Sequence, residues 1–471
     1  MLMSIDSVCF LACDARIDFC SFLTVILLSD QNALEENNAN HREELDLAAA
    51  NFNASPVGVA DVRPSESDNN ILQQILKNLH LHEQQKPPKF QFWNTQPVPK
   101  LGEIVTENTF INHPVPKEQV QQKAFDLPNG LFWSDIDLTN PEERNELYNF
   151  LYSNYVEDDD NMFRFDYSAD FLQWALMPPG WQKEWHCGFR DGKNNNELVG
   201  FISAVPCHLQ VYDKSFKCIE INFLCIHKEY RLKRLTPILF KEIFRRANLR
   251  GIFQGTFTGA NVIPKPIARC RYWHRSLNPK KLIETEFSVF RKNMTMTKTI
   301  ELYKVPENLL HNFVPLEKKH LKSAYILLMN QLKNFKLYPC FTEDEFGHFL
   351  LPRENIIYSY VLIDEKQNVT DLCSFFNLPM TVLQHSKHNH LKSAYSFYNV
   401  ATTILFKDLM QNSLIMAKKA NFDVFNALDI LENKTVFKEL KFEAGDGVLH
   451  YYLYNWKCPD LASNEVALVL Q

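Results

Sequence analysis

The chain has 471 residues, with 50 Lys and Arg against 56 Asp and Glu, 45% hydrophobic residues and a formal net charge of −6. This composition is typical of a globular protein with a large core, and it excludes a fibrous or wholly disordered chain. The chain lacks the strong positive charge of sequence-independent nucleic-acid binders, so any anionic ligand must be bound at a local site.

The 11 cysteines are scattered singly, without a CxxC pair, and no HExxH pair occurs among the 15 histidines. Isolated cysteines indicate reduced thiols in a cytoplasmic protein rather than a disulfide framework. The same spacing argues against a zinc site. We therefore expect no catalytic metal.

Two apolar runs lie near the N-terminus, at residues 8–13 and 19–28, with Asp14, Arg16 and Asp18 between them. The longer run is about half of the ~20 residues that a membrane-spanning helix needs. A signal peptide also fits poorly, because no Lys or Arg precedes the first run. We expect no transmembrane segment and interpret the runs as a short buried or partner-binding segment, with weak membrane association as the alternative.

Residues 29–85 are rich in Asn, Glu, Asp, Ser and Gln and poor in aromatic residues. Such a segment buries too little apolar surface to offset the entropy lost on ordering, so residues 1–85 are predicted to form a mostly disordered arm. A short amphipathic helix is expected within it at 70–80. The proline-punctuated, aromatic segment 87–103 is predicted to be an extended strap packed on a surface.

Helical and strand-like segments are mixed through the rest of the chain, without a repeat. Helices are predicted at 141–155, 169–175, 237–248, 318–334 and 401–420, and strands at 198–205, 208–212, 218–226, 251–258, 357–363, 372–378, 393–400, 424–428 and 448–454. Neither GxGxxG nor GxxxxGK[ST] occurs, so a Rossmann or P-loop unit is not indicated. The mixture predicts an α/β or α+β body.

The segment 220–253 carries the densest signal for an anion site. A buried strand at 221–226 runs into a basic turn, and Thr236 as N-cap with Pro237 after it opens a helix behind the turn. The basic side chains are Arg231, Lys233 and Arg234. A helix N-terminus behind basic residues presents free N–H groups and a favourable dipole to a pyrophosphate. A basic turn alone is more often a solvated surface, so both interpretations stay open at this point.

Several long motifs occur together: EDDDNMFRFDYS at 157–168, IPKPIARCRYWHRSLNPKKLIE at 263–284, SAYSFYNV at 393–400, GDGVLHYYLYNWKCP at 445–459 and VALVLQ at 466–471. With the segment 220–253, they resemble the eukaryotic glycylpeptide N-myristoyltransferases over about residues 86–471. The resemblance implies an α/β fold of two fused acetyltransferase-like (GNAT-type) halves in a pseudo-twofold arrangement. Residues 86–300 would bind acyl-CoA and residues 301–471 most of the peptide.

The resemblance implies a cytoplasmic enzyme that transfers myristate from myristoyl-CoA to the α-amine of an N-terminal glycine. Such transfer needs hydrogen-bond donors for the oxyanion and a base for the glycine ammonium, whose pKa is about 8. In the family the donors are the backbone N–H groups of Phe223 and Leu224, and the base is the terminal carboxylate, here on Gln471. Thr258 and Asn222 would sit near the amine. A terminal carboxylate with a pKa of about 3.5 helps only if the fold holds it inside, which the apolar ALVLQ end favours.

The other site residues are also carried over from the family. The acyl-CoA side would comprise Gln91, Phe92, Trp93, Phe223, Leu224, Cys225, Ile226, Arg231, Leu232, Lys233, Arg234, Leu235 and Thr236. The peptide side would comprise Val156, Asp158, Phe163, Phe165, Tyr167, Tyr272, His274, Met380, Tyr395, Asn426, Asp446 and Gly447. Cys225 is not expected to be a nucleophile, because direct transfer needs no acyl-enzyme. The expected partners are proteins with an N-terminal glycine, with no tightly bound cofactor and a monomeric enzyme.

The sequence departs from the family at several of these places. Met380 and Leu232 stand where serine is common, and Glu443 stands where a glycine usually precedes the GDG motif. The N-terminal arm is acidic instead of lysine-rich, so ribosome association stays open. Two alternatives remain: an acetyl-CoA-dependent acetyltransferase of related fold, and a catalytically silent acyl-CoA or myristoyl-peptide binding protein.

Overall fold

The structure is a computed structural model that describes residues 91–156 and 162–470. The predicted arm at 1–85, its helix at 70–80 and the two N-terminal apolar runs lie outside the described residues. The chain divides into two compact units, one of residues 27–96 and one that contains residues 97–471.

In the first unit, the described residues are 91–96, where the predicted extended strap begins instead with helix α3 (Gln91–Asn94). The turn is closed locally, because the backbone N–H and the hydroxyl of Thr95 both donate to the carbonyl of Phe92, at 3.0 and 2.7 Å. These short-range hydrogen bonds favour a helical turn over the extended strap.

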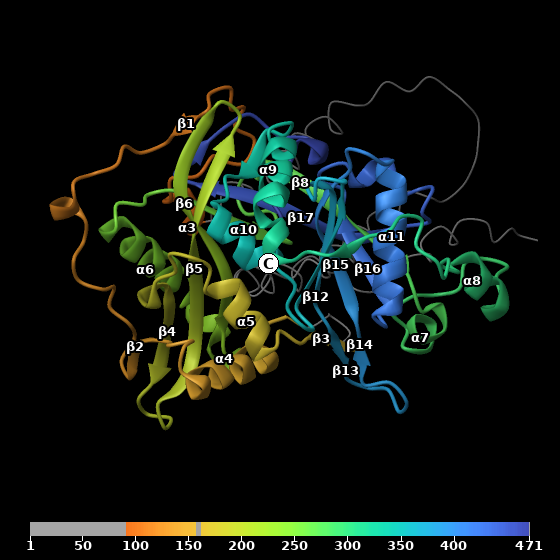
Figure 1. The fold of residues 1–471 in the computed structure, drawn as a ribbon. Coiled ribbons are helices and arrows are strands. Elements are labelled where there is room, and N and C mark those ends of the chain that lie inside the picture. Colours follow the sequence, from red (N-terminus) through yellow and green to blue (C-terminus); the bar gives the residue numbers. More distant parts are fainter. Residues whose placement is uncertain (1–90, 157–161, 471) are drawn as a thin grey trace, which may run out of the picture. The chain divides into compact units, whose positions relative to one another are not determined.

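The second unit contains both helices and strands (Figure 1). Its α-helices are α4 (Pro141–Asn154), α5 (Ala169–Leu176), α6 (Thr236–Leu249), α7 (Pro279–Glu284), α8 (Met296–Leu302), α9 (Leu321–Leu332), α10 (Glu343–Leu350) and α11 (Phe406–Lys419). Its strands are β1 (Thr109–Phe110), β2 (Leu131–Asp135), β3 (Phe163–Phe165), β4 (His186–Asp191), β5 (Glu197–Val211), β6 (Lys214–Ile226), β7 (Gly255–Gly259), β8 (Ala268–Ser276), β9 (Val314–Pro315), β10 (Leu337–Pro339), β11 (Ile357–Ile363), β12 (Val369–Asn377), β13 (Met380–Val382), β14 (His390–Leu391), β15 (Ser393–Val400), β16 (Val424–Leu428), β17 (Glu443–Tyr454) and β18 (Trp456–Lys457).

The largest sheet has the same strand pattern when followed from either end. Its order is β2-β4-β5-β6-β7-β17-β8-β16-β15-β12-β11-β9, with β10 paired to β5. From one end, β2, β4, β5 and β6 are antiparallel and β6 is parallel to β7, with α6 between them in the chain. From the other end, β9, β11, β12 and β15 are antiparallel and β15 is parallel to β16, with α11 between them. The predicted α/β class with two pseudo-twofold halves is confirmed.

The two halves exchange a strand at the centre of the sheet. β8 follows β7 in the chain but pairs with β16, and β17 follows β16 but pairs with β7. β8 and β17 also pair with each other. The division near residue 300 stays a prediction, and the sheet is continuous across the two halves.

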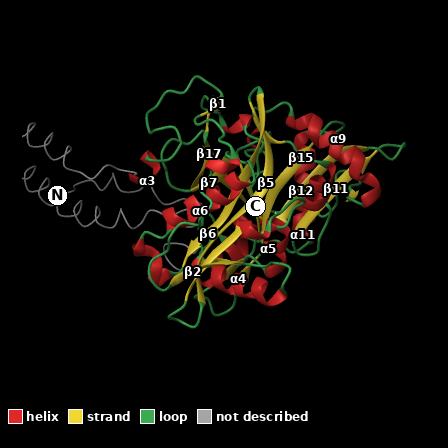
Figure 2. Ribbon diagram, turned by 90° about the vertical axis from the view of Figure 1, so that its left-hand side faces the viewer, coloured by secondary structure: helices red, strands yellow, loops and turns green. Residues whose placement is uncertain are grey.

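Helices cover both faces of the half that contains β12 and β15 (Figure 2). Phe375 belongs to the apolar cluster that includes Leu409 and Leu414 of α11, whereas the next residue, Phe376, belongs to the cluster that includes Leu328 of α9. Successive strand residues point to opposite faces, so both faces of β12 are buried. This explains why these strands are nearly continuous apolar runs in the sequence.

The two predicted strands at 198–205 and 208–212 are a single long strand, β5, which continues through Pro206. On one side Pro206 is paired in register with Ile219 of β6. On the other side of β5, pairing with β4 extends only to Ser203, and pairing with β10 starts at Leu209. The missing N–H of the proline therefore interrupts no ladder on that side.

The N-terminus of α6 also differs from the prediction. Thr236 is the first helical residue, and the N-cap is Leu235, which provides no side-chain hydrogen bond. Pro237 still lies in the first turn, where its missing N–H is tolerated.

A buried carboxylate anchors α6. Glu242 is 0% exposed and accepts hydrogen bonds from Arg245 at 2.7 Å, from Arg246 at 2.8 Å and from the backbone N–H of Phe125 at 3.2 Å. Burial opposes ionisation, but the two arginines more than offset it and lower the pKa of Glu242. The helix is thereby joined to the segment that precedes β2.

Replacing Glu242 with Ala should lower the free energy of unfolding by about 3–5 kcal/mol, because the partly buried guanidinium of Arg245 would lose its counter-ion and that of Arg246 would keep only Asp135. Urea unfolding at pH 7 measures this. Glu301→Ala is the control, since Glu301 is exposed and lies 4.0 Å from Lys304, so a change below about 1 kcal/mol is expected. Similar small losses in both variants would show that Glu242 does not anchor the helix.

Candidate active site

The ladder between β5 and β6 is interrupted at Phe223 and Leu224. Phe201 faces Cys225 and Ser203 faces Asn222, so β6 contains an extra residue at this point. Phe223 is fully buried and has a φ of +52°, which is rare for a residue with a bulky side chain. Such strain persists only where the surrounding structure enforces it, and strained residues cluster at functional sites.

Two tyrosines pack against this bulge. The rings of Tyr155 and Tyr167 lie 5.6 and 5.1 Å from that of Phe223, centroid to centroid. Burial raises the pKa of Tyr155, and a hydrogen bond from the Phe223 backbone to its hydroxyl acts in the opposite direction. The backbone at Phe223 therefore makes a contact outside the strand ladder.

Beside the bulge, β6 separates from its parallel neighbour β7. The two strands pair only at Ile219 with Gly255 and at Glu220 with Thr256. Thr258 is instead paired with Tyr451 of β17. Asn222, which precedes Phe223, and Thr258 thus lie on the diverging ends of neighbouring strands, and both are 6% exposed.

The basic turn after β6 is held by one of its own arginines. The guanidinium of Arg231 donates to the carbonyls of Asn154 at 2.5 Å and Ile226 at 3.4 Å. The ammonium of Lys233 lies 3.8 Å above the ring of Tyr230, and Arg234 is exposed with a φ of +54°. The structure thus gives Arg231 a structural contact, while Lys233 and Arg234 extend at the surface before the N-terminus of α6.

The other residues predicted on the acyl-CoA side are mostly buried. Those with little exposure are Trp93, Leu224, Cys225, Ile226, Leu235 and Thr236, whereas Gln91 is exposed and Phe92 is half-buried. Burial raises the pKa of the Cys225 thiol, which disfavours the thiolate that a nucleophile needs. The side chain of Leu232 lies outside the described part of the structure.

The predicted peptide residues from the two halves meet in a small sheet. β13 pairs with β3, with Met380 opposite Phe165, and β14 continues the sheet on the other side of β13. Val156, Phe163, Tyr167 and Met380 are all buried. Asp158 lies outside the described residues.

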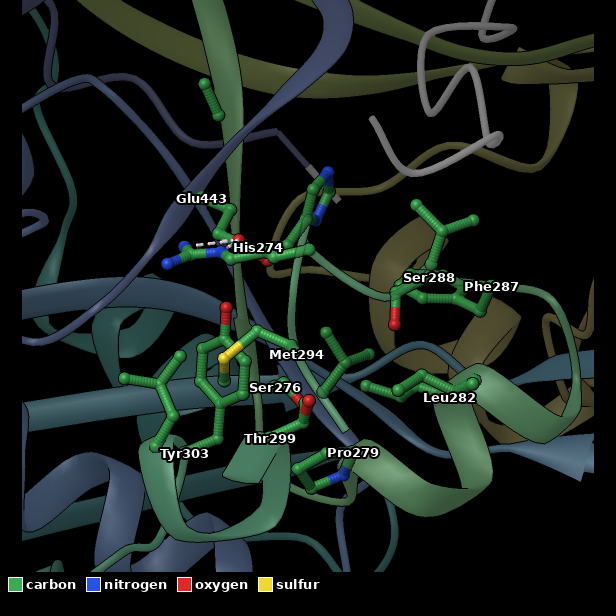
Figure 3. Close-up of a pocket in the computed structure, with 16 residues that line it drawn as sticks. His274, Ser276, Pro279, Leu282, Phe287, Ser288, Met294, Thr299, Tyr303 and Glu443 are labelled. Carbon is green, nitrogen blue, oxygen red and sulfur yellow. Dashed lines mark hydrogen bonds and ion pairs between the residues drawn. The ribbon is translucent and has the colours of Figure 1, made fainter. Parts of the chain in front are cut away.

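Another predicted peptide residue, His274 on β8, lines a pocket together with Ser276, Phe287 and Glu443 (Figure 3). Nδ1 of His274 lies 2.7 Å from Oδ1 of Asn426, which makes the ring nitrogen the donor. Burial lowers the pKa of His274 to about 4, so the imidazole is neutral at physiological pH. The pocket has a volume of about 50 Å³, and Figure 3 shows Phe287 and Ser288 on a different side of this pocket from Tyr303.

The GDG motif forms a bulge in β17 against His274. Between Ala444 and Val448 the register with β8 shifts, which places Gly445, Asp446 and Gly447 in the irregular segment. A Cβ atom on Gly445 would lie 2.3 Å from Nε2 of His274, so a glycine is needed there. Asp446 is exposed and Gly447 is buried.

Glu443, which replaces a usual glycine, is accommodated without strain. It is the first residue of β17, an extended conformation that any residue adopts, and it lies opposite His274. Its carboxylate accepts a hydrogen bond of 2.5 Å from Nε of Arg291.

The C-terminal segment runs through the interior. Residues 466–469 are all buried, Leu431 donates its N–H to the carbonyl of Val466 at 2.9 Å, and the hydroxyl of Tyr451 donates to the carbonyl of Leu468 at 2.8 Å. Val469 and Leu470 line a cavity of about 30 Å³ together with Thr258, Tyr272 and Tyr395. Gln471 itself lies outside the described residues and follows Leu470 directly.

Sequence reasoning missed Glu220, a buried carboxyl group beside the site. Glu220 is 7% exposed, and Oε1 accepts a hydrogen bond of 2.7 Å from Nδ2 of Asn222. Burial raises the pKa of Glu220 to about 7, and the hydrogen bond from Asn222 only partly offsets this. The available signal was an acidic residue within the apolar run 218–226, two positions before Asn222 and therefore on the same face of the strand.

Two further features concern the described ranges, 91–156 and 162–470. No group of three or more His, Cys, Asp or Glu side chains there could hold a metal ion. Within the same ranges, every helix is too short or too polar to cross a membrane.

Comparisons with known proteins agree with this arrangement. The family model "Myristoyl-CoA:protein N-myristoyltransferase, N-terminal domain" matches residues 110–270, and the model of the C-terminal domain matches residues 284–468. Glycylpeptide N-tetradecanoyltransferase 2 of Bos taurus is 52% identical over 81% of this chain and 76% of its own length. Glycylpeptide N-tetradecanoyltransferase of Drosophila melanogaster is 47% identical over 90% of both.

A solved structure shares the fold. The crystal structure of Saccharomyces cerevisiae N-myristoyltransferase with bound myristoyl-CoA matches with a TM-score of 0.78 and 34% identity, over 81% of this chain and 99% of that chain. The fold is thus that of an acyltransferase. The chain belongs to the myristoyl-CoA:protein N-myristoyltransferase family, and the predicted enzyme class, glycylpeptide N-tetradecanoyltransferase, is confirmed.

The burial of Glu220 makes stability depend on pH. Its folded-state pKa of about 7 lies above the ordinary value of 4.5, so the contribution of this group to stability is fully present below pH 4.5 and is lost as the pH rises through 7. Glu220→Gln removes the ionisation. The Tm of the variant relative to the unmodified protein should therefore increase between pH 5 and pH 8, as followed by thermal unfolding. A difference that stays constant over this range would show that Glu220 ionises normally in the folded protein.

Proposed function

We propose that this protein transfers a myristoyl group from myristoyl-CoA to the α-amine of the N-terminal glycine of acceptor proteins. Two observations carry the proposal: the strained bulge at Phe223, and the cavity that the buried Thr258 shares with the C-terminal segment. The relatives named glycylpeptide N-tetradecanoyltransferase and the yeast enzyme with bound myristoyl-CoA support the same substrates.

The bulge supports an oxyanion site. A residue added to a strand is left outside the regular ladder, so its N–H can serve another acceptor. The N–H groups of Phe223 and Leu224 would donate to the thioester oxygen as it gains negative charge, and the N–H of Phe223 would exchange the hydroxyl of Tyr155 for this oxygen. Because the donors are fixed before the reaction, they need no reorganisation in the transition state.

The chemical step is direct. The neutral glycine amine attacks the thioester carbonyl, a C–N bond forms, and the C–S bond breaks to release the thiol of CoA. The α-carboxylate of Gln471 would accept the proton that the glycine ammonium loses, and Thr258 with Asn222 would hold the amine. The burial of residues 466–469 supports this role, because a weak base helps only when it is desolvated next to the ammonium.

Acyl-CoA and peptide would approach from different elements. Lys233, Arg234 and the N-terminus of α6 would hold the CoA phosphates. The peptide would lie along β3 and β13 toward His274, Asn426 and Tyr395, with Gly447 and Asp446 at its side. A monomeric state and a cytoplasmic location remain predictions.

The first experiment compares the native C-terminus with a variant extended by three residues beyond Gln471. We expect myristoyl transfer to an N-terminal glycine peptide from the native protein, and a loss of kcat of roughly 100-fold on extension, the usual scale for removing a general base. Both proteins should bind myristoyl-CoA equally. Acetyl-CoA in place of myristoyl-CoA tests the acetyltransferase alternative in the same assay.

The outcomes separate the base from the function. Equal activity of the native and extended proteins refutes the base assignment and leaves the transferase activity intact. Binding of myristoyl-CoA without transfer by the native protein refutes the function and favours a silent binding protein.

Gly445→Ala should weaken peptide binding and leave acyl-CoA binding unchanged. The added Cβ would displace His274 and disturb its hydrogen bond to Asn426. Losing one such bond costs ~1–2 kcal/mol, so the KM for the peptide should rise roughly tenfold in steady-state assays.

Gly347→Ala on α10 is the matched control, because its Cβ would lie 3.6 Å from Leu321, an ordinary contact. An unchanged peptide KM in Gly445→Ala would place the peptide away from His274.

A further inference from the structure

Glu220 faces a small cavity on the side of β6 that carries Asn222. The cavity has a volume of about 20 Å³, about the size of one water molecule, and Leu468 and Val469 of the C-terminal segment form part of its wall. Val469 also lines the cavity that contains Thr258. Val469 of the C-terminal segment therefore lies between the cavity of Glu220 and the cavity that contains Thr258.

The titratable groups around Glu220 do not include a lysine or arginine among the described residues that line this cavity. They are Cys207 and His208 of β5, Cys340 after β10, Glu345 of α10, Tyr398 of β15 and, through its electrostatic interaction with Glu220, Tyr451 of β17. Burial alone is the dominant cause of the raised pKa of Glu220, and the opposing interaction comes from Asn222. The carboxyl group of Glu220 is therefore held by a hydrogen bond from Asn222 and, among the described residues, not by an ion pair.

We propose that Glu220 is a positioning residue that fixes the orientation of the Asn222 side-chain amide for the transfer reaction. This inference rests on the proposed function, in which Asn222 holds the glycine amine. An ionised carboxylate only accepts hydrogen bonds, so it selects the –NH₂ group of Asn222. The amide oxygen is then left on the opposite side, where it can accept a hydrogen bond from the ammonium or amine of the glycine.

Protonation of Glu220 removes this selection. A carboxylic acid has an O–H that can donate to the oxygen of Asn222, so the amide can turn and present its N–H groups to the ammonium, with no hydrogen bond between the two. The ionised form is therefore the active one. Activity should fall with decreasing pH through the pKa of Glu220.

The test uses variants of the full chain assayed with myristoyl-CoA and an N-terminal glycine peptide. In Glu220→Leu, kcat should fall roughly tenfold or more, because one hydrogen bond to a charged group is lost. The Kd for myristoyl-CoA should not change. Glu220→Gln should recover part of the kcat, because its amide oxygen still accepts from Asn222, and it should lose the decrease of kcat near pH 7.

Glu345→Gln is the matched control. Glu345 lines the same cavity, and its carboxylate accepts from the backbone and hydroxyl of Thr342 at the start of α10, where glutamine can replace it. This variant removes a carboxylate from the cavity without contact to Asn222. Its kcat and pH profile should match those of the unmodified protein.

A double-mutant cycle decides whether Glu220 acts through Asn222. If it does, Glu220→Leu combined with Asn222→Ala is no slower than Asn222→Ala alone. Losses that multiply, or an unchanged kcat and pH profile in Glu220→Gln and Glu220→Leu, overturn the proposal. If Glu220→Leu does not fold, the pH profile of Glu220→Gln decides.

The proposed function fails in a different way. Absence of transfer by the unmodified protein refutes the function, and the role of Glu220 with it. Normal transfer by the unmodified protein and by Asn222→Ala alike leaves the function standing and overturns the role of Glu220.

Discussion

The interruption of the β5–β6 ladder at Phe223 is the constraint on which the site depends. One extra residue in β6 forces a positive φ on a buried phenylalanine, and the packing of Tyr155 and Tyr167 holds it there. The same stretch of β6 separates from β7, which places Asn222 and Thr258 on diverging strands. A regular ladder would leave neither backbone donors nor space for a reacting group.

The exchange of β8 and β17 joins the two halves around this point. β17 pairs with Thr258 on one side and carries the GDG bulge against His274 on the other. The residues proposed to hold the amine and those proposed to hold the peptide are therefore connected through one strand. The buried C-terminal segment reaches the same region, so Thr258, Tyr395 and Leu470 share a cavity although they are far apart in the sequence.

The strands that consist mainly of apolar residues could be predicted from the sequence. The strands at 357–363, 393–400 and 424–428 have the predicted bounds, because their residues are predominantly apolar. β8 was missed because Arg269 and Arg271 interrupt its apolar residues, although their alternation with buried residues is the pattern of a half-buried strand. A proline such as Pro206 would end a strand only if neighbouring strands were paired with it on both sides. Whether they are depends on where the pairing between β4 and β5 ends. This is a tertiary fact that a local pattern does not contain.

For the site, too, some features could be predicted from the sequence and others depend on the tertiary structure. Its side chains could be placed by resemblance to a family, but the roles of Phe223 and Leu224 rest on the backbone, which no side-chain pattern reveals. Glu220 was missed because its hydrogen bond with Asn222 forms only when the strand is folded and buried. Thr236 was placed one residue out, because the helix begins without a side-chain cap.

The strand exchange has a consequence for synthesis of the chain. β7 ends at Gly259, whereas its neighbour β17 begins at Glu443, so one edge of β7 has no partner until the second half has been made. Unpaired strand edges promote aggregation, and pairings between distant segments form slowly. The half that contains β7 therefore cannot complete its sheet until β17 has been made. Its final folding step must wait for β17, and chaperones that shield exposed edges would act on the nascent chain during that interval.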